Sequence, residues 1–320
     1  MQNAASHPSP LDLLRPPPGV QPNYIDPPSK AGTLRTLDAV FLTLMLIAVL
    51  IRVFVRLRYT KAWGWDDATC ALAAIGSTAH TAMHMEGINR GIGRHIWDIP
   101  IPWLASAENI RIFEANGINY PFTILFAKLS ILLFYLRIFR INNILRALIY
   151  ITIFVLTGFY LAIFVLGIVA VAKCGLSFAA DPVCHAIQGP LIFINGGFNV
   201  ATDFYILILP FPLLSALNLR LGQKLGVAAV FACGLAACAA SLARLIASAL
   251  TYHTSDVFWD TATTSMFTTV EMNIVIIVSC VSTFPTFYSK TRVYLQSTTS
   301  SIRSRLFASP RGSVNSSEKA

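Results

Sequence analysis

The sequence contains little charge for its length. Of its 320 residues, 12% are Asp, Glu, Lys or Arg, whereas 55% are hydrophobic and the mean hydropathy is +0.63. Because soluble domains are about one quarter charged, this composition excludes an ordinary water-soluble protein. The stretches between the apolar segments are short and leave no room for a second, soluble domain. We therefore expect an integral protein of a lipid bilayer.

Several patterns that would indicate a specific chemistry are also missing. The cysteines and histidines show no spacing typical of a zinc site. His80 and His84 stand four residues apart, but no third ligand is evident, and a wetted helix end accounts for them. The last apolar stretch has no lysine before Lys290, which disfavours a retinal Schiff base. We predict no metal and no other cofactor and assign no catalytic residue; enzymatic activity is an open but less favoured alternative.

Seven apolar stretches divide the chain, each long enough to cross the roughly 30 Å hydrocarbon core of a bilayer as a helix. The expected spans are residues 36–57, 67–87, 110–138, 147–172, 188–215, 225–250 and 265–288. The pattern predicts an all-α, polytopic membrane protein whose residues 33–289 form a seven-transmembrane-helix bundle.

The two ends of the chain have a different composition from the bundle. Residues 1–32 are rich in proline and lack the apolar core of a cleavable signal peptide, so we expect a disordered extracellular arm. Residues 290–320 are rich in Ser, Thr and Arg, and we expect a disordered, basic cytosolic tail.

The basic residues predict how the bundle is oriented. With the N-terminus outside, 15 Lys and Arg residues fall on the cytosolic side and 7 on the outer side, while two lie inside spans. Basic residues accumulate on the cytosolic side of membrane proteins, so the count favours an outer N-terminus and a cytosolic C-terminus. We expect a multi-pass protein of the plasma membrane. Nucleic acid is excluded as a partner because these charges are spread over short loops.

Cys174 and Cys184 share the predicted outer loop between the fourth and fifth spans. The outer compartment oxidises thiols, so we predict a disulfide between them. The other four cysteines fall inside spans, where cysteine behaves as a small apolar residue.

Ionisable side chains inside the spans need partners, because an isolated charge in a bilayer is costly. Lys128 and Asp203 are expected at similar depth in the inner half, and Arg244 and Glu271 at similar depth in the outer half. We predict that each set forms a buried ion pair. Two interpretations stay open: both pairs only fix helix packing, or the outer pair also forms the floor of a ligand pocket that opens to the exterior.

The pocket hypothesis assigns specific ligand-binding residues. Glu114, Asn119, Arg244 and Glu271 would bound the pocket, and a glycine-rich loop at residues 91–100 that contains His95 would cover it. The reason is depth, because a molecule arriving from outside can reach polar groups in the outer half.

Several short motifs occur together and in a fixed order. They are Trp-Gly-Trp-Asp-Asp at 63–67, Gly-Ile-Gly-Arg-His at 91–95, Ala-Lys-Leu-Ser-Ile-Leu at 127–132 running to Tyr-Leu-Arg-Ile-Phe at 135–139, Asp203 before Leu-Pro-Phe-Pro at 209–212, Arg244, Asp256 and Glu271. Across about residues 35–290 the chain resembles the fungal rhodopsin-domain family of seven-helix membrane proteins, which includes the receptor-like Pth proteins of plant-pathogenic fungi.

The resemblance implies one of two functions. The first is a receptor-like sensor of an extracellular small molecule other than retinal, which would signal to a cytosolic protein. The alternative is a membrane transporter, or a membrane-embedded accessory protein or enzyme of a fungal secondary-metabolite pathway. A transporter would be favoured by inverted repeats, and the sequence has no convincing internal repeat. A structural scaffold is a third interpretation.

Overall fold

The computed structural model describes residues 16–100, 106–138, 142–174, 182–211, 221–252, 254, 256–281, 283, 284 and 287. Within these ranges it describes the side chains of all residues except 107, 109, 110, 138, 174, 182–188 and 221–230. The predicted cytosolic tail, residues 290–320, lies outside the described residues.

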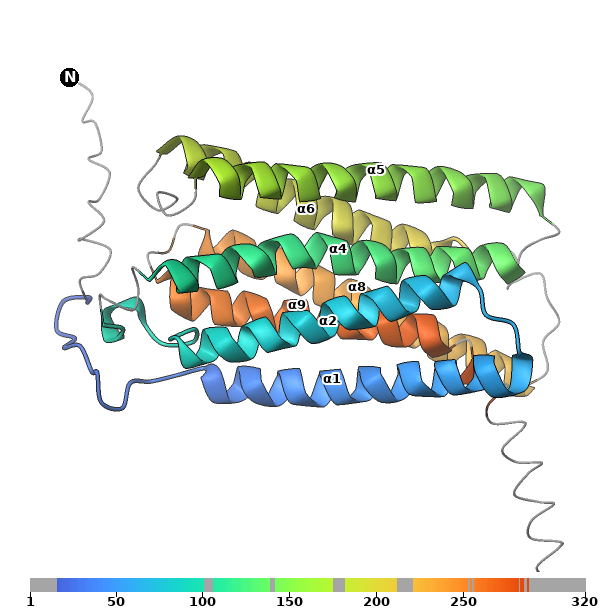
Figure 1. Cartoon of the computed structure of the whole chain (residues 1–320), viewed down its shortest axis with the longest axis horizontal. Helices are drawn as coiled ribbons and strands as arrows, with labels where there is room; N and C mark the ends of the chain where they lie inside the picture. The colour runs from blue at the N-terminus through green and yellow to red at the C-terminus, as the bar shows by residue number, and fades with distance from the viewer. Residues whose placement is uncertain are drawn as a thin grey trace, which may run out of the picture.

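Seven long helices run side by side with alternating directions (Figure 1). They are α1 (Ala31–Phe54), α2 (Trp65–Asn89), α4 (Ala107–Ile138), α5 (Asn143–Cys174), α6 (Pro182–Ile208), α8 (Leu221–Thr251) and α9 (Val257–Val281), with a π-helical turn η2 (Val55–Thr60) and a 3-10 turn η3 (Ile96–Asp98). Helices satisfy their backbone hydrogen bonds within the segment, as a bilayer requires. The described part of the chain is therefore all-helical, apart from one isolated bridge between Ser29 and Arg94.

Six of the seven helices are long and apolar enough to cross a membrane, by length and composition alone. The exception is α2, which carries Asp66, Asp67, His80, His84 and Glu86. All but the last of these side chains are buried inside the bundle. A helix that turns polar residues towards its neighbours needs a less apolar sequence than one that faces lipid, so the low hydropathy of α2 follows from its position.

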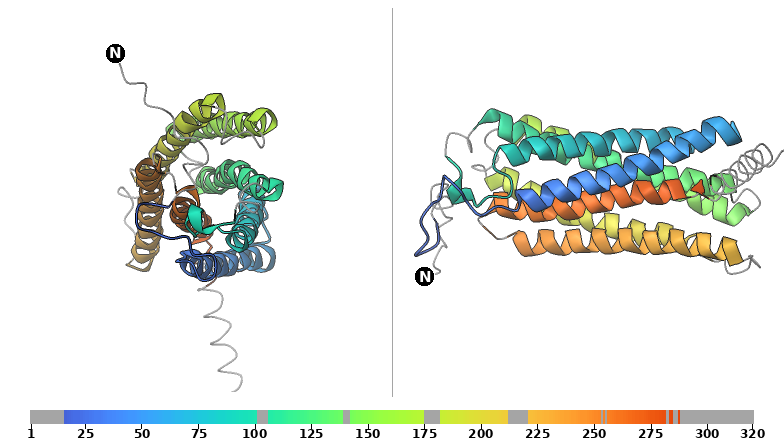
Figure 2. Two further views of the ribbon diagram at one scale, coloured as in Figure 1. Left: turned by 90° about the vertical axis from the view of Figure 1, so that its left-hand side faces the viewer. Right: turned by 90° about the horizontal axis from the view of Figure 1, so that it is seen from below.

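Helix α9 lies near the centre of the bundle, as Figure 2 shows. It packs against α1, α2, α4 and α8, whereas α5 packs mainly on α4. Helices α2 and α4 approach closely at Gly76, where an added Cβ would lie 2.2 Å from Thr123 Oγ1. The burial of α9 and the exposure of α5, the most hydropathic of the spans, agree with a bundle surrounded by lipid.

Residues 16–30, the loop of residues 90–100 and the start of α9 meet at one end of the bundle (Figure 1). We call this the arm end, and the other end, where α2 begins, the opposite end. At the arm end the Asn23 backbone N–H donates to Asp98 Oδ1 at 2.8 Å, and the Lys30 N–H donates to the Gly93 carbonyl at 2.9 Å. Gly93 has a φ of 92°, which glycine tolerates best.

The seventh helix differs from its predicted span. Apolar residues alone predicted 265–288, but α9 covers Val257–Val281. Its first two turns are amphipathic and were therefore missed: Trp259 and Thr263 contact Lys30 of the arm instead of facing lipid. The shift places Glu271 14 residues from the start of the helix, about 21 Å along its axis, and so deeper than predicted.

Candidate functional site

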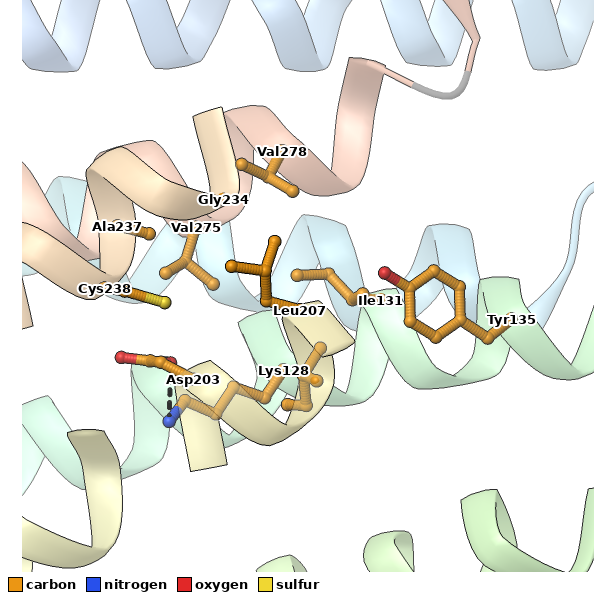
Figure 3. Close-up of a pocket in the computed structure, with 11 residues that line it drawn as sticks. Lys128, Ile131, Tyr135, Asp203, Leu207, Gly234, Ala237, Cys238, Val275 and Val278 are labelled. Atoms are coloured by element: carbon orange, nitrogen blue, oxygen red, sulfur yellow. Dashed lines mark ion pairs between the residues drawn. The ribbon is translucent and has the colours of Figure 1, made fainter. Parts of the chain in front are cut away.

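Lys128 of α4 reaches Asp203 of α6 in the middle of the bundle. The Lys128 Nζ atom lies 2.8 Å from Asp203 Oδ1, and the two side chains are 1% and 6% exposed (Figure 3). The ammonium group also donates to Thr202 Oγ1 at 2.7 Å and to the Asn199 carbonyl at 3.0 Å. A lysine has three N–H donors, so this buried charge is fully hydrogen-bonded.

Arg244 of α8 and Glu271 of α9 form the second buried pair. Arg244 Nε lies 2.7 Å from Glu271 Oε2. The Tyr120 hydroxyl donates to Glu271 Oε1 at 2.9 Å, and the Arg244 guanidinium lies over the Tyr120 ring, 4.8 Å from its centroid. The glutamate therefore accepts hydrogen bonds from α4 and α8 at once.

Asn199 of α6 joins the two pairs. Its amide nitrogen donates to Glu271 Oε1 at 2.6 Å and to Asp203 Oδ2 at 3.3 Å, while its oxygen accepts from the Tyr160 hydroxyl at 2.9 Å. The result is one polar network with two positive and two negative charges. We call it the central polar network; its members are Lys128, Asp203, Asn199, Glu271, Arg244, Tyr120 and Tyr160.

The continuity of this network corrects the expected separation into an inner and an outer pair. That separation placed Glu271 in the outer half of its span, because the seventh helix was expected to begin at residue 265. With α9 beginning at Val257, Glu271 lies at a depth where one asparagine, Asn199, contacts both carboxylates. The two pairs are therefore neighbours.

A small cavity of about 40 Å³ adjoins Lys128 and Asp203. It extends from the ion pair towards the opposite end and is lined mainly by apolar side chains of α4, α6, α8 and α9, including Ile131, Leu207 and Val278 (Figure 3). A single water molecule occupies about 30 Å³ in the liquid, whereas pockets for drug-sized ligands start at about 300 Å³. This cavity accommodates water or a methyl group and lies on the other side of the network from the expected pocket.

The residues assigned to the ligand pocket are placed as follows. Arg244 and Glu271 meet in the central polar network. Asn119 donates to the Gly76 carbonyl at 2.9 Å, and Glu114 is half-buried on α4. Among the contacts of the described residues, none joins Glu114, Asn119 or His95 to the Arg244–Glu271 pair.

His95 is held at the arm end by aromatic rings and a carboxylate. Its ring stacks between Trp97 and Trp259, at centroid distances of 4.7 and 4.0 Å, and its Nδ1 lies 2.5 Å from Asp256 Oδ2. Trp259 also contacts the arm, because Lys30 Nζ lies over its ring, 4.2 Å from the ring centroid. Partial burial lowers the pKa of the Lys30 ammonium. These contacts fasten the glycine-rich loop to the start of α9, and we call them the arm-end clasp.

A cluster of five charged residues at the opposite end was not expected. Arg52 lies 2.7 Å from Asp66 and 2.8 Å from Asp67, Arg56 lies 2.8 and 3.0 Å from the same two carboxylates, and Arg137 lies 3.3 Å from Asp66. We call it the opposite-end ion cluster. From the sequence, these arginines are expected to be charges of short cytosolic loops. The sequence signal for the cluster is two arginines four residues apart, hence on one helical face, shortly before two adjacent aspartates.

The predicted disulfide between Cys174 and Cys184 lies outside the described side chains and stays a prediction. Among the described cysteines, Cys70, Cys233, Cys238 and Cys280 are free thiols. Cys70 and Cys280 lie beside each other in the core, with their sulfur atoms 3.7 Å apart.

Comparison with known proteins identifies the family. The model of the fungal rhodopsin domain matches residues 51–290, three quarters of the chain. A SAT4 family membrane protein of Emericella nidulans is 29% identical over 233 residues, which are 71% of this chain and 55% of that protein. Receptor GIN3 of Arthrobotrys oligospora is 28% identical over 150 residues, which are 45% of this chain and 35% of the receptor. The chain thus matches about half or less of the length of these relatives. No solved structure matches it.

Proposed function

This chain belongs to the fungal rhodopsin domain family, and we propose that it is a receptor-like protein that senses an extracellular small molecule other than retinal. Its family and its apolar helices make it a multi-pass membrane protein. One relative carries the name of a receptor, which supports the proposal.

The proposed topology has seven membrane crossings, with the arm end outside and the opposite end in the cytosol of the plasma membrane. The excess of basic residues supports this orientation. Three of the 15 residues counted as cytosolic, Arg52, Arg56 and Arg137, are paired in the opposite-end ion cluster. The 12 that remain (15 − 3) still outnumber the 7 on the outer side.

The observation that carries the receptor proposal is the position of α9, which contacts all three polar sites. At the arm end its residue Trp259 stacks on His95 in the arm-end clasp. In the middle of the bundle Glu271 accepts hydrogen bonds in the central polar network. Near the opposite end the Ser279 carbonyl accepts a hydrogen bond from Arg52. A ligand that displaces the clasp would therefore act on the same helix that ends beside the proposed cytosolic face.

The central polar network would act as the two-state element of such a receptor. Its hydrogen bonds join α4, α5, α6, α8 and α9, and buried polar contacts hold helices in discrete arrangements rather than along a continuum. Retinal is not part of the proposal, because α9 contains no lysine and Lys128 is engaged by three acceptors.

The proposal is tested in intact cells that express the full chain with a luciferase at its C-terminus and a G-protein α subunit fused to a fluorescent acceptor. Small molecules separated by polarity are added from outside, and resonance energy transfer is recorded. We expect at least one fraction to change the transfer for the wild-type chain and not for Asp256→Asn, which loosens the clasp. If no fraction changes the energy transfer with any G-protein α subunit of the host, the chain does not signal through a G protein.

A transporter, or an accessory protein of a secondary-metabolite pathway, is the second candidate, because buried ionisable residues also mark transport pathways. The same cells distinguish the two functions. Uptake of a labelled compound that requires Lys128 and Asp203, without any change in energy transfer, would favour transport over sensing.

A further inference from the structure

A second group of polar side chains lies buried in the arm half of the bundle, apart from the central polar network. Asp38 of α1 and His80 and His84 of α2 are 0%, 3% and 1% exposed. The two imidazole rings lie 4.0 Å apart, and His84 Nδ1 lies 3.4 Å from Asp38 Oδ2. Asn116 of α4 lies within hydrogen-bonding reach of the His80 ring. We call Asp38, His80, His84 and Asn116 the arm-side polar cluster; its depth corrects the expectation of a wetted helix end at His80 and His84.

Apart from the 3.4 Å contact between His84 and Asp38 and the interaction of His80 with Asn116, most polar atoms of this cluster lack a protein partner in good hydrogen-bond geometry. Nine shielded side-chain nitrogen and oxygen atoms find no hydrogen-bond partner among the described residues, and six of them belong here: Asp38 Oδ2, both ring nitrogens of His80 and of His84, and Asn116 Oδ1. The other Asp38 oxygen accepts a hydrogen bond from the Thr269 hydroxyl of α9 at 2.6 Å. Buried polar groups in proteins are almost always hydrogen-bonded, and surrounding lipid offers no donor or acceptor in place of water.

The chemistry of these atoms indicates what binds them. In the part of the chain with described side chains, no group of three His, Cys, Asp or Glu residues is arranged to hold a metal ion. The carboxylate and amide oxygens accept hydrogen bonds, and each neutral imidazole offers one donor and one acceptor. A mixed set at such short distances matches water, which donates two hydrogen bonds and accepts two. With about three hydrogen bonds per buried water, six atoms correspond to about two molecules.

We propose that the arm-side polar cluster is an internal water-binding site, in which water molecules bridge the imidazoles of His80 and His84 to Asp38 and Asn116. This inference does not depend on the proposed function, since it follows from the buried polar atoms that lack a hydrogen-bond partner.

An apolar layer separates the site from the arm end. Leu34 and Ile88 lie one helical turn closer to the arm end than Asp38 and His84, and they pack with Ile92 and Ala262 in a separate buried cluster. All four side chains are at most 4% exposed. Water in the site is therefore enclosed, and it exchanges with the outer solution only when this layer opens.

The test is radiolytic footprinting of the full-length protein in lipid nanodiscs, in which a millisecond X-ray pulse generates hydroxyl radicals from bound water and mass spectrometry locates the oxidised side chains. Met45 is the control, because it is 0% exposed in the apolar core of the same bundle and methionine is the more reactive residue. We expect His80 and His84 to be oxidised faster than Met45. Oxidation no faster than that of Met45 would overturn the proposal.

Two further measurements sharpen the result. In His80→Phe an apolar ring fills the site, so oxidation of His84 should fall to the level of Met45; unchanged oxidation would refute the bridging role. The second uses wild-type protein only and does not depend on the variant folding. After rapid mixing with ¹⁸O-water, heavy oxygen should enter exposed side chains such as Trp65 at once and His84 only after a delay. Simultaneous entry would show an open vestibule and contradict an enclosed site.

Discussion

The central polar network and the opposite-end ion cluster both bury charge, but their partners lie at very different distances along the chain. In the opposite-end ion cluster, Arg52 and Arg56 meet Asp66 and Asp67, which are 10 to 15 residues away. In the central polar network, Asn199 and Glu271 are 72 residues apart. The contacts of Arg52 and Arg56 can form as soon as α1 and α2 pair, before Arg137 of α4 adds its contact with Asp66 from 71 residues away. The central polar network requires the assembled bundle.

The two regions also differ in redundancy. Asp66 and Asp67 each contact both Arg52 and Arg56, so the loss of one carboxylate leaves the other in place. Glu271 has no such duplicate: it is the carboxylate that accepts from both Arg244 and Tyr120, and Asn199 shares its amide between Glu271 and Asp203. Two regions of one bundle can therefore bury similar numbers of charges and still differ in how well they tolerate the loss of a single carboxylate.

The largest effect is expected for Glu271→Gln, which removes the negative charge beside Arg244 and leaves that guanidinium buried. Breaking a buried pair costs about 3–5 kcal/mol, so the detergent-solubilised variant should unfold at a clearly lower temperature, monitored by tryptophan fluorescence. Glu114→Gln is the matched control, because Glu114 is only half-buried on α4. If both variants lower the unfolding temperature equally, the contacts of Glu271 in the central polar network are not what stabilises the bundle.

The second substitution series tests Lys128 and Asp203 as a pair. Asp203→Asn leaves the buried Lys128 ammonium without its counter-charge. This uncompensated charge should lower the yield of folded protein and its expression at the cell surface. The double change Lys128→Met with Asp203→Leu removes both charges and should recover part of the loss, since apolar replacements of buried pairs are often tolerated. If the loss of surface expression in the double variant equals the sum of the losses in the two single variants, the two groups do not interact.

A smaller effect is expected for Asp66→Asn in the opposite-end ion cluster. Arg52 and Arg56 keep Asp67, so the loss should be nearer the cost of one buried hydrogen-bonded group, about 1–3 kcal/mol. Asp66→Asn combined with Asp67→Asn removes all the acceptor carboxylates of this cluster and should cost more than the two single changes together. Strictly additive losses, measured by thermal unfolding, would show that the two aspartates are not interchangeable.

The sequence predicted the helices well because their signal is local. Long apolar stretches located seven helices, although α6 begins six residues and α9 eight residues before the predicted spans. The early start of α9 was missed because Trp259 and Thr263 face the arm rather than lipid. The candidate site was harder to predict. The polar residues of the network could be identified as candidates from their burial in apolar spans, but the link through Asn199 depends on where α6 and α9 cross. Asp38 also falls inside a predicted span and was overlooked, and its partners Thr269 and His84 could not be predicted because they come from other helices.

The smallest effect on stability is expected at the arm-end clasp, where His95 and Asp256 are partly exposed. Exposed ion pairs contribute about 0–1 kcal/mol, so His95→Ala should change the unfolding temperature little. It should instead speed hydrogen exchange at the backbone amide of Ile96, which donates to Asp256 Oδ1 at 3.0 Å. His95→Phe keeps the stacking between Trp97 and Trp259 but loses the contact with Asp256, and so separates the two contributions. If His95→Ala destabilised the protein as much as Glu271→Gln, the clasp would belong to the same cooperative unit as the central polar network, and a ligand could not open one without disrupting the other.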